Sequence, residues 1–206
     1  MGLLRLDPMK TSFALLTLLG AALIASAQES PTIKGHKIGE SINEYLTTEN
    51  GGADSAARAL TDCATLLNNP KERKKQAYRA ENCQQIAAAW NGDTVELTGE
   101  AKGGKFEFAS RKLVAIGLLL FRDFNEVEPD LIEKFGPPDT KVDAVYENVF
   151  GAVYVHPRAA WTRRPDITIF AIESPSEPSG VIVLVTDRAY SDSLKKKEGK
   201  RPNSLN

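Results

Sequence analysis

Residues 105–138 read KFEFASRKLVAIGLLLFRDFNEVEPDLIEKFGPP, and this stretch decides the fold class. Phe106 and Phe108 alternate with charged residues, which predicts a half-buried strand. Residues 113–121 are apolar except for Gly117, a pattern typical of a central strand covered on both faces. A short polar break separates the two runs, so we expect them to pair as a hairpin.

The same stretch then changes to a helical pattern. Asn125 and Glu128 have the spacing of a capping box, so we expect a helix to begin at Asn125. Apolar residues then recur at helical spacing as far as Phe135. Gly136 and the two prolines after it predict the end of the helix there.

Upstream of this stretch the chain is mostly helical. Ser41 and Glu44 have capping-box spacing and predict a short helix. Residues 54–90 follow with a helical composition, and Pro70 after Asn69 predicts that a second helix of this region begins there.

Strand patterns dominate after residue 94 and are strongest at Ile167–Ile172 and Val181–Asp187. Helices and strands are therefore segregated, which predicts an α+β fold with antiparallel sheet or sheets and helices packed on one face. Residues 28–190 would form a single domain, in which 33–121 and 122–190 can be two tandem helix-plus-strands units. The charged residues 191–206 predict a disordered tail.

The first 27 residues have the features of a signal peptide. Arg5 and Lys10 precede a mostly apolar run from Thr11 to Ile24, and Ala25-Ser26-Ala27 fits a signal peptidase site. The apolar run is shorter than the ~20 residues that span a bilayer, so we expect export to the periplasm or the medium and no membrane anchor. No later stretch is long and apolar enough to span a membrane.

Charge and cysteine content narrow the classes of function. Removing the leader takes two basic and one acidic residue from totals of 26 and 27, which leaves a net charge of −2. This balance argues against nucleic acid as a partner. Cys63 and Cys83 are the only two cysteines of the chain. In an oxidising compartment we expect them to form one structural disulfide, which would join two helices of a helical insert.

Few residues suggest catalysis. The two histidines, His36 and His156, have no Cys, Asp or second His at ligand spacing, so we interpret both as polar loop residues. His156 precedes Pro157 and should be extended. No nucleophile elbow, P-loop, zinc-protease or dinucleotide motif is present. We therefore predict no catalytic residue, no metal and no cofactor.

Residues Leu131–Pro138, Trp161 and Ile167–Ile172 follow a pattern of helix, glycine and proline, then strands. This pattern resembles the fold shared by β-lactamase inhibitor proteins and small outer-membrane assembly lipoproteins. The chain also looks like exported bacterial α+β proteins that contain a G-x-x-[IL]-G-[ED]-[ST] phrase, here residues 35–41. The resemblance implies a protein-binding role. The lipidation cysteine of the lipoproteins is absent, and no inhibitory residue can be carried over.

The ribbon from residue 154 to 164, YVHPRAAWTRR, is the predicted partner-binding surface. It contains residue types that are enriched at interface hot spots: Tyr154, Arg158, Trp161, Arg163 and Arg164. The alternative is that Trp161 packs in the core and the arginines are solvated.

Two functions follow. The favoured hypothesis is an exported non-enzymatic protein-binding or envelope-interaction module, of which an inhibitor of a secreted enzyme would be a special case. The alternative is an extracytoplasmic hydrolase, which needs a pocket where His36 or His156 meets a carboxylate or a serine. The sequence leaves the partner and the oligomeric state open.

Overall fold

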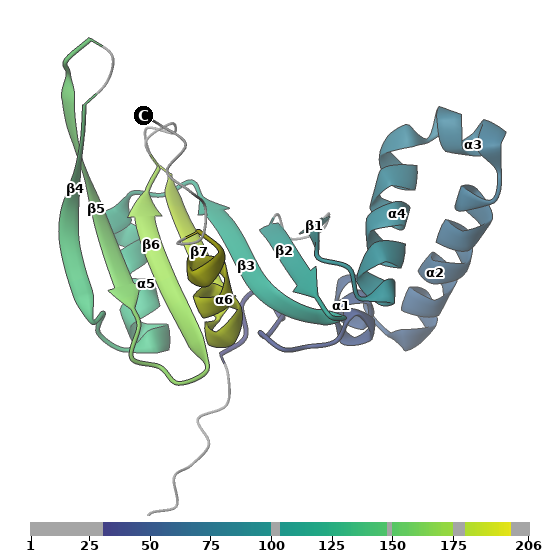
Figure 1. Cartoon of the computed structure of the whole chain (residues 1–206), viewed down its shortest axis with the longest axis horizontal. Helices are drawn as coiled ribbons and strands as arrows, with labels where there is room; N and C mark the ends of the chain where they lie inside the picture. The colour runs from purple at the N-terminus through teal and green to yellow at the C-terminus, as the bar shows by residue number, and fades with distance from the viewer. Residues whose placement is uncertain (1–30, 100–103, 148–149, 175–179, 199–206) are drawn as a thin grey trace, which may run out of the picture.

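The computed structural model describes residues 31–99, 104–147, 150–174 and 180–198 (Figure 1). The predicted signal peptide and the last eight residues of the predicted tail lie outside these ranges. The helices are α1 (Ile42–Glu49), α2 (Ala53–Leu67), α3 (Pro70–Lys75), α4 (Ala77–Asn91), α5 (Phe124–Phe135) and α6 (Arg188–Glu198). The strands are β1 (Val95–Gly99), β2 (Gly104–Ala109), β3 (Lys112–Leu120), β4 (Thr140–Glu147), β5 (Val153–Trp161), β6 (Ile167–Glu173) and β7 (Val181–Asp187).

All seven strands form one antiparallel sheet in the order β1-β2-β3-β7-β6-β5-β4. Two meanders meet where β3 pairs with β7, so the last strand of the chain joins the two halves. The predicted α+β fold with an antiparallel sheet is therefore confirmed. Helices α1–α4 lie at the β1 end of the sheet, and the β4–β5 hairpin projects at the other end (Figure 1).

The core covers one face of the sheet without interruption. One row of inward side chains crosses six strands, because the register aligns Leu97, Phe106, Ile116, Val185, Ile169 and Trp161. Helix α1 contributes Ile42, Tyr45 and Leu46 to the same core, and α5 contributes the apolar stripe that ends at Phe135. One apolar cluster thus spans both halves of the chain.

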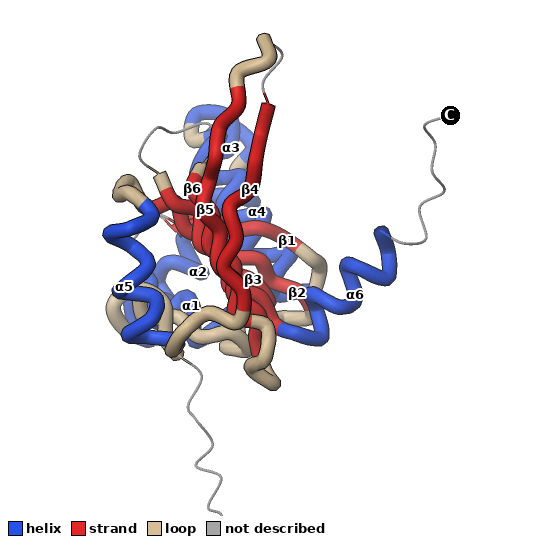
Figure 2. The backbone as a smooth tube through the Cα atoms, turned by 90° about the vertical axis from the view of Figure 1, so that its left-hand side faces the viewer, coloured by secondary structure: helices blue, strands red, loops and turns tan. Residues whose placement is uncertain are grey.

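Helix α6 lies on the opposite face of the sheet from α5 (Figure 2). Its Tyr190 hydroxyl donates to Glu107, which alternates with the inward-facing Phe106 and Phe108 and so points to the other side. Helix α6 was not predicted from the sequence. The prediction of disorder is wrong for residues 191–198, where the charged face of α6 is exposed while its first turn docks on the sheet.

Local boundaries differ from the predictions in three places. Helix α5 begins one residue earlier than expected, with Asp123 as N-cap. The Glu128 carboxylate, which was expected to complete a capping box, lies 2.6 Å from Lys141 Nζ. The helix expected from Pro70 is two helices, because the backbone at Gln76 leaves the helical region. Strand β3 is covered on both faces only in part: on its outer face Ala115 is 5% exposed, whereas Leu119 is 41% exposed.

Candidate functional site

A cavity of about 500 Å³ lies between α1, α2, α4 and β1. Its apolar wall comes from Leu46, Leu60, Ile86, Leu97 and the Cys63–Cys83 disulfide. Charged side chains also line it, and these are Glu49, Arg58, Asp62 and Arg79. The volume lies in the range of about 300–1,000 Å³ that is usual for small-molecule sites.

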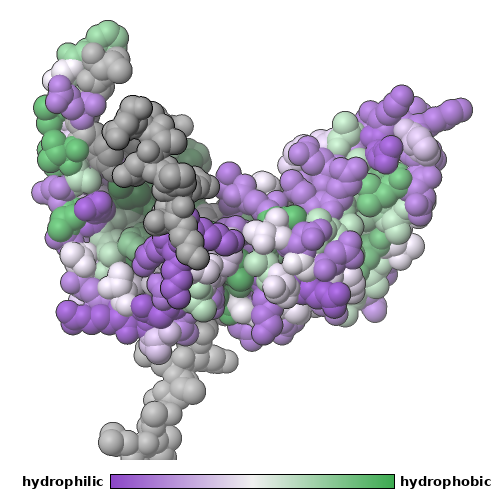
Figure 3. Space-filling model, viewed as in Figure 1, coloured by the Kyte–Doolittle hydropathy of each residue, from purple (hydrophilic) through white to green (hydrophobic). Residues whose placement is uncertain are grey.

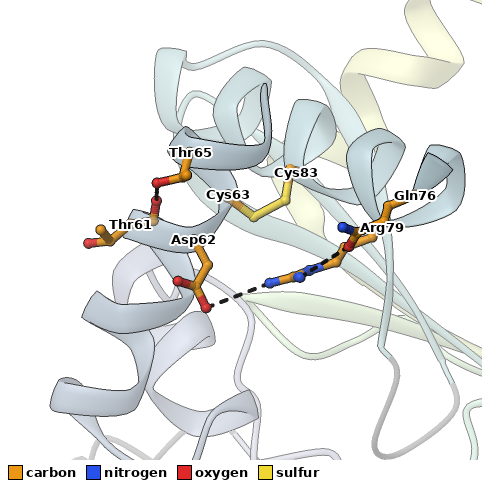
Figure 4. Close-up of a disulfide and its surroundings, with 7 residues drawn as sticks. All are labelled: Thr61, Asp62, Cys63, Thr65, Gln76, Arg79 and Cys83. Carbon is orange, nitrogen blue, oxygen red and sulfur yellow. Dashed lines mark hydrogen bonds and ion pairs between the residues drawn. A yellow bond between two sulfur atoms is a disulfide. The ribbon is translucent and has the colours of Figure 1, made fainter. Parts of the chain in front are cut away.

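The disulfide holds the two walls of this cavity together. Cys63 on α2 and Cys83 on α4 are bonded with 5.2 Å between their Cα atoms, which confirms the pairing predicted from the sequence. Figure 4 shows the bond bridging the two helices, with Asp62 and Arg79 beside it. Arg79 Nη2 lies 3.6 Å from Asp62 Oδ2, and both side chains are more than half exposed.

A buried histidine stands behind the cavity. His36 lies in a tight turn between Gly35 and Gly39, both of which have positive φ, and its side chain is 0% exposed. Its Nδ1 lies 2.6 Å from Glu40 Oε1, and its Nε2 lies 2.9 Å from Glu49 Oε1. We call His36, Glu40 and Glu49 the carboxylate–histidine triad.

Aromatic rings enclose the imidazole of the triad. The ring centroids of Tyr45 and Phe106 lie 4.8 and 4.9 Å from that of His36. Glu40 is 4% exposed and also accepts from the Lys37 backbone N–H at 3.2 Å. Glu49 is the only triad member that lines the cavity, so it is the group through which the triad meets the cavity.

The triad has a net charge that does not depend on where its protons sit. Both ring nitrogens face carboxylates, so two protons are shared between three groups if both hydrogen bonds are made. An imidazolium with two carboxylates carries −1, and so does a neutral imidazole with one carboxylate and one carboxylic acid. Burial lowers the pKa of His36, but the hydrogen bonds and charges of Glu40 and Glu49 outweigh it and raise the pKa above 6.5.

The interpretation of His36 as a polar loop residue was therefore wrong. Its backbone is in a turn, but its side chain is fully buried and paired on both nitrogens. Glu40 could have been suspected, because it lies four residues from His36 inside the glycine-flanked phrase of residues 35–41. The pairing of Glu49 with His36 could be found only from the tertiary structure, because helix α1 brings Glu49 to His36 from 13 residues away.

The second histidine lies at the base of the projecting hairpin. His156 is extended in β5, as predicted from Pro157, and its Nδ1 lies 3.2 Å from Glu173 Oε2 on β6. Both histidines thus meet a carboxylate, which is one part of what the hydrolase hypothesis required; the other part was a pocket, and neither histidine lines the cavity described above. Within the described residues, no group of three His, Cys, Asp or Glu side chains is placed to hold a metal ion.

The predicted partner-binding residues do not form one surface. Trp161 is 2% exposed, its indole contacts Phe135, and its Nε1 donates to the Gly136 carbonyl at 2.7 Å. It is a core residue, so the hot-spot interpretation was wrong for Trp161. Alternation along β5 places Tyr154 and Arg158 on the other face of the sheet.

The two remaining arginines lie in the loop after β5. Arg163 is 85% exposed, and its Nε lies 3.3 Å from Asp139 Oδ1. Arg164 is largely buried, and its carbonyl accepts from Arg188 Nε of α6 at 2.8 Å. Arg164 therefore helps to fix α6, whereas Arg163 stands apart from Tyr154 and Arg158 at the far end of the strand.

The outer part of the β4–β5 hairpin exposes several apolar side chains. We call residues 142–147 and 150–157 the arm. Strand β6 pairs with β5 only from Arg158 to Trp161, so the arm extends beyond the sheet as two strands alone. Val145, Val153 and Val155 are each more than half exposed, and Phe150 is 90% exposed. Figure 3 shows hydrophobic residues along this arm at the upper left.

No protein-family model, curated protein or solved structure significantly matches this chain. Within the described residues, no helix has the length and apolar character required to cross a bilayer.

Proposed function

We propose that this chain is an exported, non-enzymatic module that binds another extracytoplasmic protein through the arm. The observation that carries the proposal is the gathering of exposed apolar side chains on a two-stranded ribbon that projects beyond the sheet. An isolated hairpin is marginally stable in water. A partner that covered these side chains would therefore stabilise the arm as well as gain buried apolar area.

The chemistry of the arm favours an extended apolar segment of a protein as its occupant. Strand β4 is the last strand of the sheet, and its outer backbone edge is available for one more strand. Val142 and Val145 are exposed on opposite faces of this strand. An extended segment with apolar side chains on both of its faces could therefore pair with the β4 backbone and contact both valines.

Charge on and beside the arm favours a protein over an anionic membrane. Asp143 and Glu147 lie on β4, and Lys141 and Arg158 lie at the base of the arm, so the charges balance. An anionic lipid surface would select a basic cluster instead. The resemblance to β-lactamase inhibitor proteins and assembly lipoproteins points to the same class of function, since those proteins bind proteins.

The hydrolase alternative has one observation in its favour, the pairing of each histidine with a carboxylate. A general base needs a ring nitrogen within reach of a substrate proton. In His36 both nitrogens face carboxylates and the ring is 0% exposed, so this histidine is placed to hold a charge and not to transfer a proton to substrate.

The test uses residues 28–206 as bait in an extracytoplasmic extract of the source organism. A triple variant, Val145→Ser, Val153→Ser and Val155→Ser, removes the exposed apolar row of the arm. A matched control, Ile132→Ser, removes an exposed apolar side chain of α5. We expect a specific protein to be retained by the wild type and the control and lost from the triple variant, with slower hydrogen exchange of residues 142–147 in the complex.

Capture that survives the triple variant would overturn the arm as the binding surface. Binding of the wild type to phosphatidylglycerol vesicles, with no arm-dependent protein partner, would replace the protein by a membrane. Hydrolysis of a substrate that is lost on replacement of His156 would favour the enzyme instead.

A further inference from the structure

We propose that the cavity between α1, α2, α4 and β1 is a binding site for a small cationic amine with an apolar body. The positive end of this ligand would contact Glu49, and its apolar body would lie against Leu46, Leu60, Ile86, Leu97 and the disulfide. This site is independent of the arm, which lies at the opposite end of the sheet (Figure 1).

The first argument is electrostatic. The triad carries −1 in either protonation arrangement, and its members are almost completely removed from water. A buried net charge is costly unless a countercharge is near. Glu49 is the member that lines the cavity, so a cation bound at this wall would lie beside the net negative charge of the triad.

The second argument is the position of the Glu49 carboxylate. His36 Nε2 engages its Oε1 and fixes the group at the wall. The other oxygen lies beside β1, where a Cβ added to Gly99 would be 3.4 Å from Oε2. This is an ordinary van der Waals distance, so Oε2 lies against β1. The close contact that requires glycine here is with Phe106, whose ring would be 2.7 Å from the same Cβ.

The third argument is the distribution of polarity over the walls. The charged residues other than Glu49 are exposed, and two of them, Asp62 and Arg79, pair with each other. Arg58 donates to Ser55 Oγ at 3.1 Å. Leu46 and Leu97 are buried, in contrast, so the inner wall is apolar with a carboxylate set into it. An apolar body with an amine at one end matches this arrangement.

The test is calorimetric titration of the mature protein with n-hexylammonium chloride, with n-hexanol and sodium hexanoate as neutral and anionic analogues. We expect hexylammonium to bind and both analogues to bind at least about tenfold more weakly, because they lack the charge-assisted hydrogen bond. Hexanoate binding more tightly than hexylammonium would overturn the proposal and assign the cavity to anions through Arg58 and Arg79.

Three variants locate the site. Glu49→Gln keeps an acceptor for His36 Nε2 but removes the charge, and we expect about ten- to hundredfold weaker binding. Asp62→Asn removes a carboxylate from the exposed side of the same cavity and should change affinity by less than about threefold. Ala59→Leu leaves every charge in place and fills the cavity, so it should also weaken binding. This variant keeps the proposal testable if Glu49→Gln fails to fold.

Affinity unchanged in Glu49→Gln or in Ala59→Leu, with the variant folded by circular dichroism, would overturn the proposal. Titration with N-acetyl-lysine methylamide distinguishes two sources of the cation. Binding of hexylammonium alone identifies a free alkylamine, and binding of both probes extends the site to a lysine side chain of a protein.

Discussion

The indole Nε1 of Trp161 donates to the carbonyl of Gly136 at 2.7 Å, and this hydrogen bond joins the end of β5 to the end of α5. Gly136 ends the helix with φ +80, which turns the chain toward β4. The indole also contacts Phe135 edge-on, with 6.3 Å between ring centroids. Trp161 therefore fixes the helix on the sheet in the half of the molecule that carries the arm.

Replacing this indole should lower stability without affecting binding by the arm. Trp161→Phe keeps a ring but loses the hydrogen bond and part of the buried area, and we expect the free energy of unfolding to fall by about 1–3 kcal/mol. Trp90→Phe is the matched control, since Trp90 on α4 is 42% exposed and its replacement should cost less than about 0.5 kcal/mol. Urea unfolding followed by circular dichroism measures both.

Equal stability of the two tryptophan variants would contradict the core role of Trp161. Loss of partner capture by a Trp161→Phe protein that unfolds like the wild type would restore the original interpretation of Trp161 as a binding residue.

Reduction of the disulfide should weaken the helical insert. The bond closes a loop with a sequence separation of 20 residues. On the chain-entropy model it contributes about 3 kcal/mol, so Cys63→Ser with Cys83→Ser should lower the free energy of unfolding by about that amount. Wild-type protein in dithiothreitol should match the double variant, and dithiothreitol should not change the variant further. An unchanged urea midpoint after reduction would show that helix packing alone holds α2 and α4.

Sequence patterns predicted most of the fold because those elements carry local information. The Ser41 capping box forms as expected, with Ser41 N–H to Glu44 Oε2 at 2.7 Å and Glu44 N–H to Ser41 Oγ at 3.2 Å. The docking of α6 was not predicted, because it depends on a contact of Tyr190 with Glu107, far away along the chain. The turn at Gln76 was not predicted either.

The candidate site was harder to predict than the fold. Because histidine is polar, we expected His36 in an exposed loop. Its side chain is instead 0% exposed, which is possible because both ring nitrogens pair with carboxylates. The exposure of the arm was missed for a different reason. Val145, Val153 and Val155 are apolar strand residues, but the pairing of β6 with β5 ends at Arg158 and leaves these side chains exposed. Burial at both places is set by tertiary pairing and not by the local pattern.

The triad should make stability depend on pH. The pKa of His36 is raised above 6.5 in the fold, so its protonated form is favoured there. The resulting stabilisation is complete below pH 6.5 and is lost as pH rises through the folded pKa. The titratable groups that face the ring are Glu40, Glu49 and Tyr45. We expect the imidazole of His36 to titrate above its unfolded value in an NMR pH series.

Glu40→Gln should lower the pKa of His36, because it removes one carboxylate that favours the imidazolium. The same change should make unfolding free energy less dependent on pH above 6.5. His156→Gln is the control, since it leaves the triad intact and should preserve the dependence. A His36 resonance that titrates below 6.5 in the wild type would contradict the raised pKa.

Tyr190 and Arg188 should together determine whether α6 stays on the sheet. The Tyr190 hydroxyl donates to Glu107, and Arg188 donates to carbonyls of the loop that follows β5.

Burial, followed by the hydrogen bond and the charge of Glu107, raises the pKa of Tyr190 to about 12. The neutral phenol is thus favoured in the fold, and its contribution is complete below pH 10 and is lost as pH rises toward 12. In an alkaline absorbance titration, Tyr190→Phe should remove a tyrosine that titrates near pH 12. The same variant should speed hydrogen exchange in α6, whereas Tyr78→Phe, at a 65% exposed position of α4, should change neither result. Exchange in α6 that is equal in the wild type and Tyr190→Phe would show that the Arg188 contacts alone hold the helix.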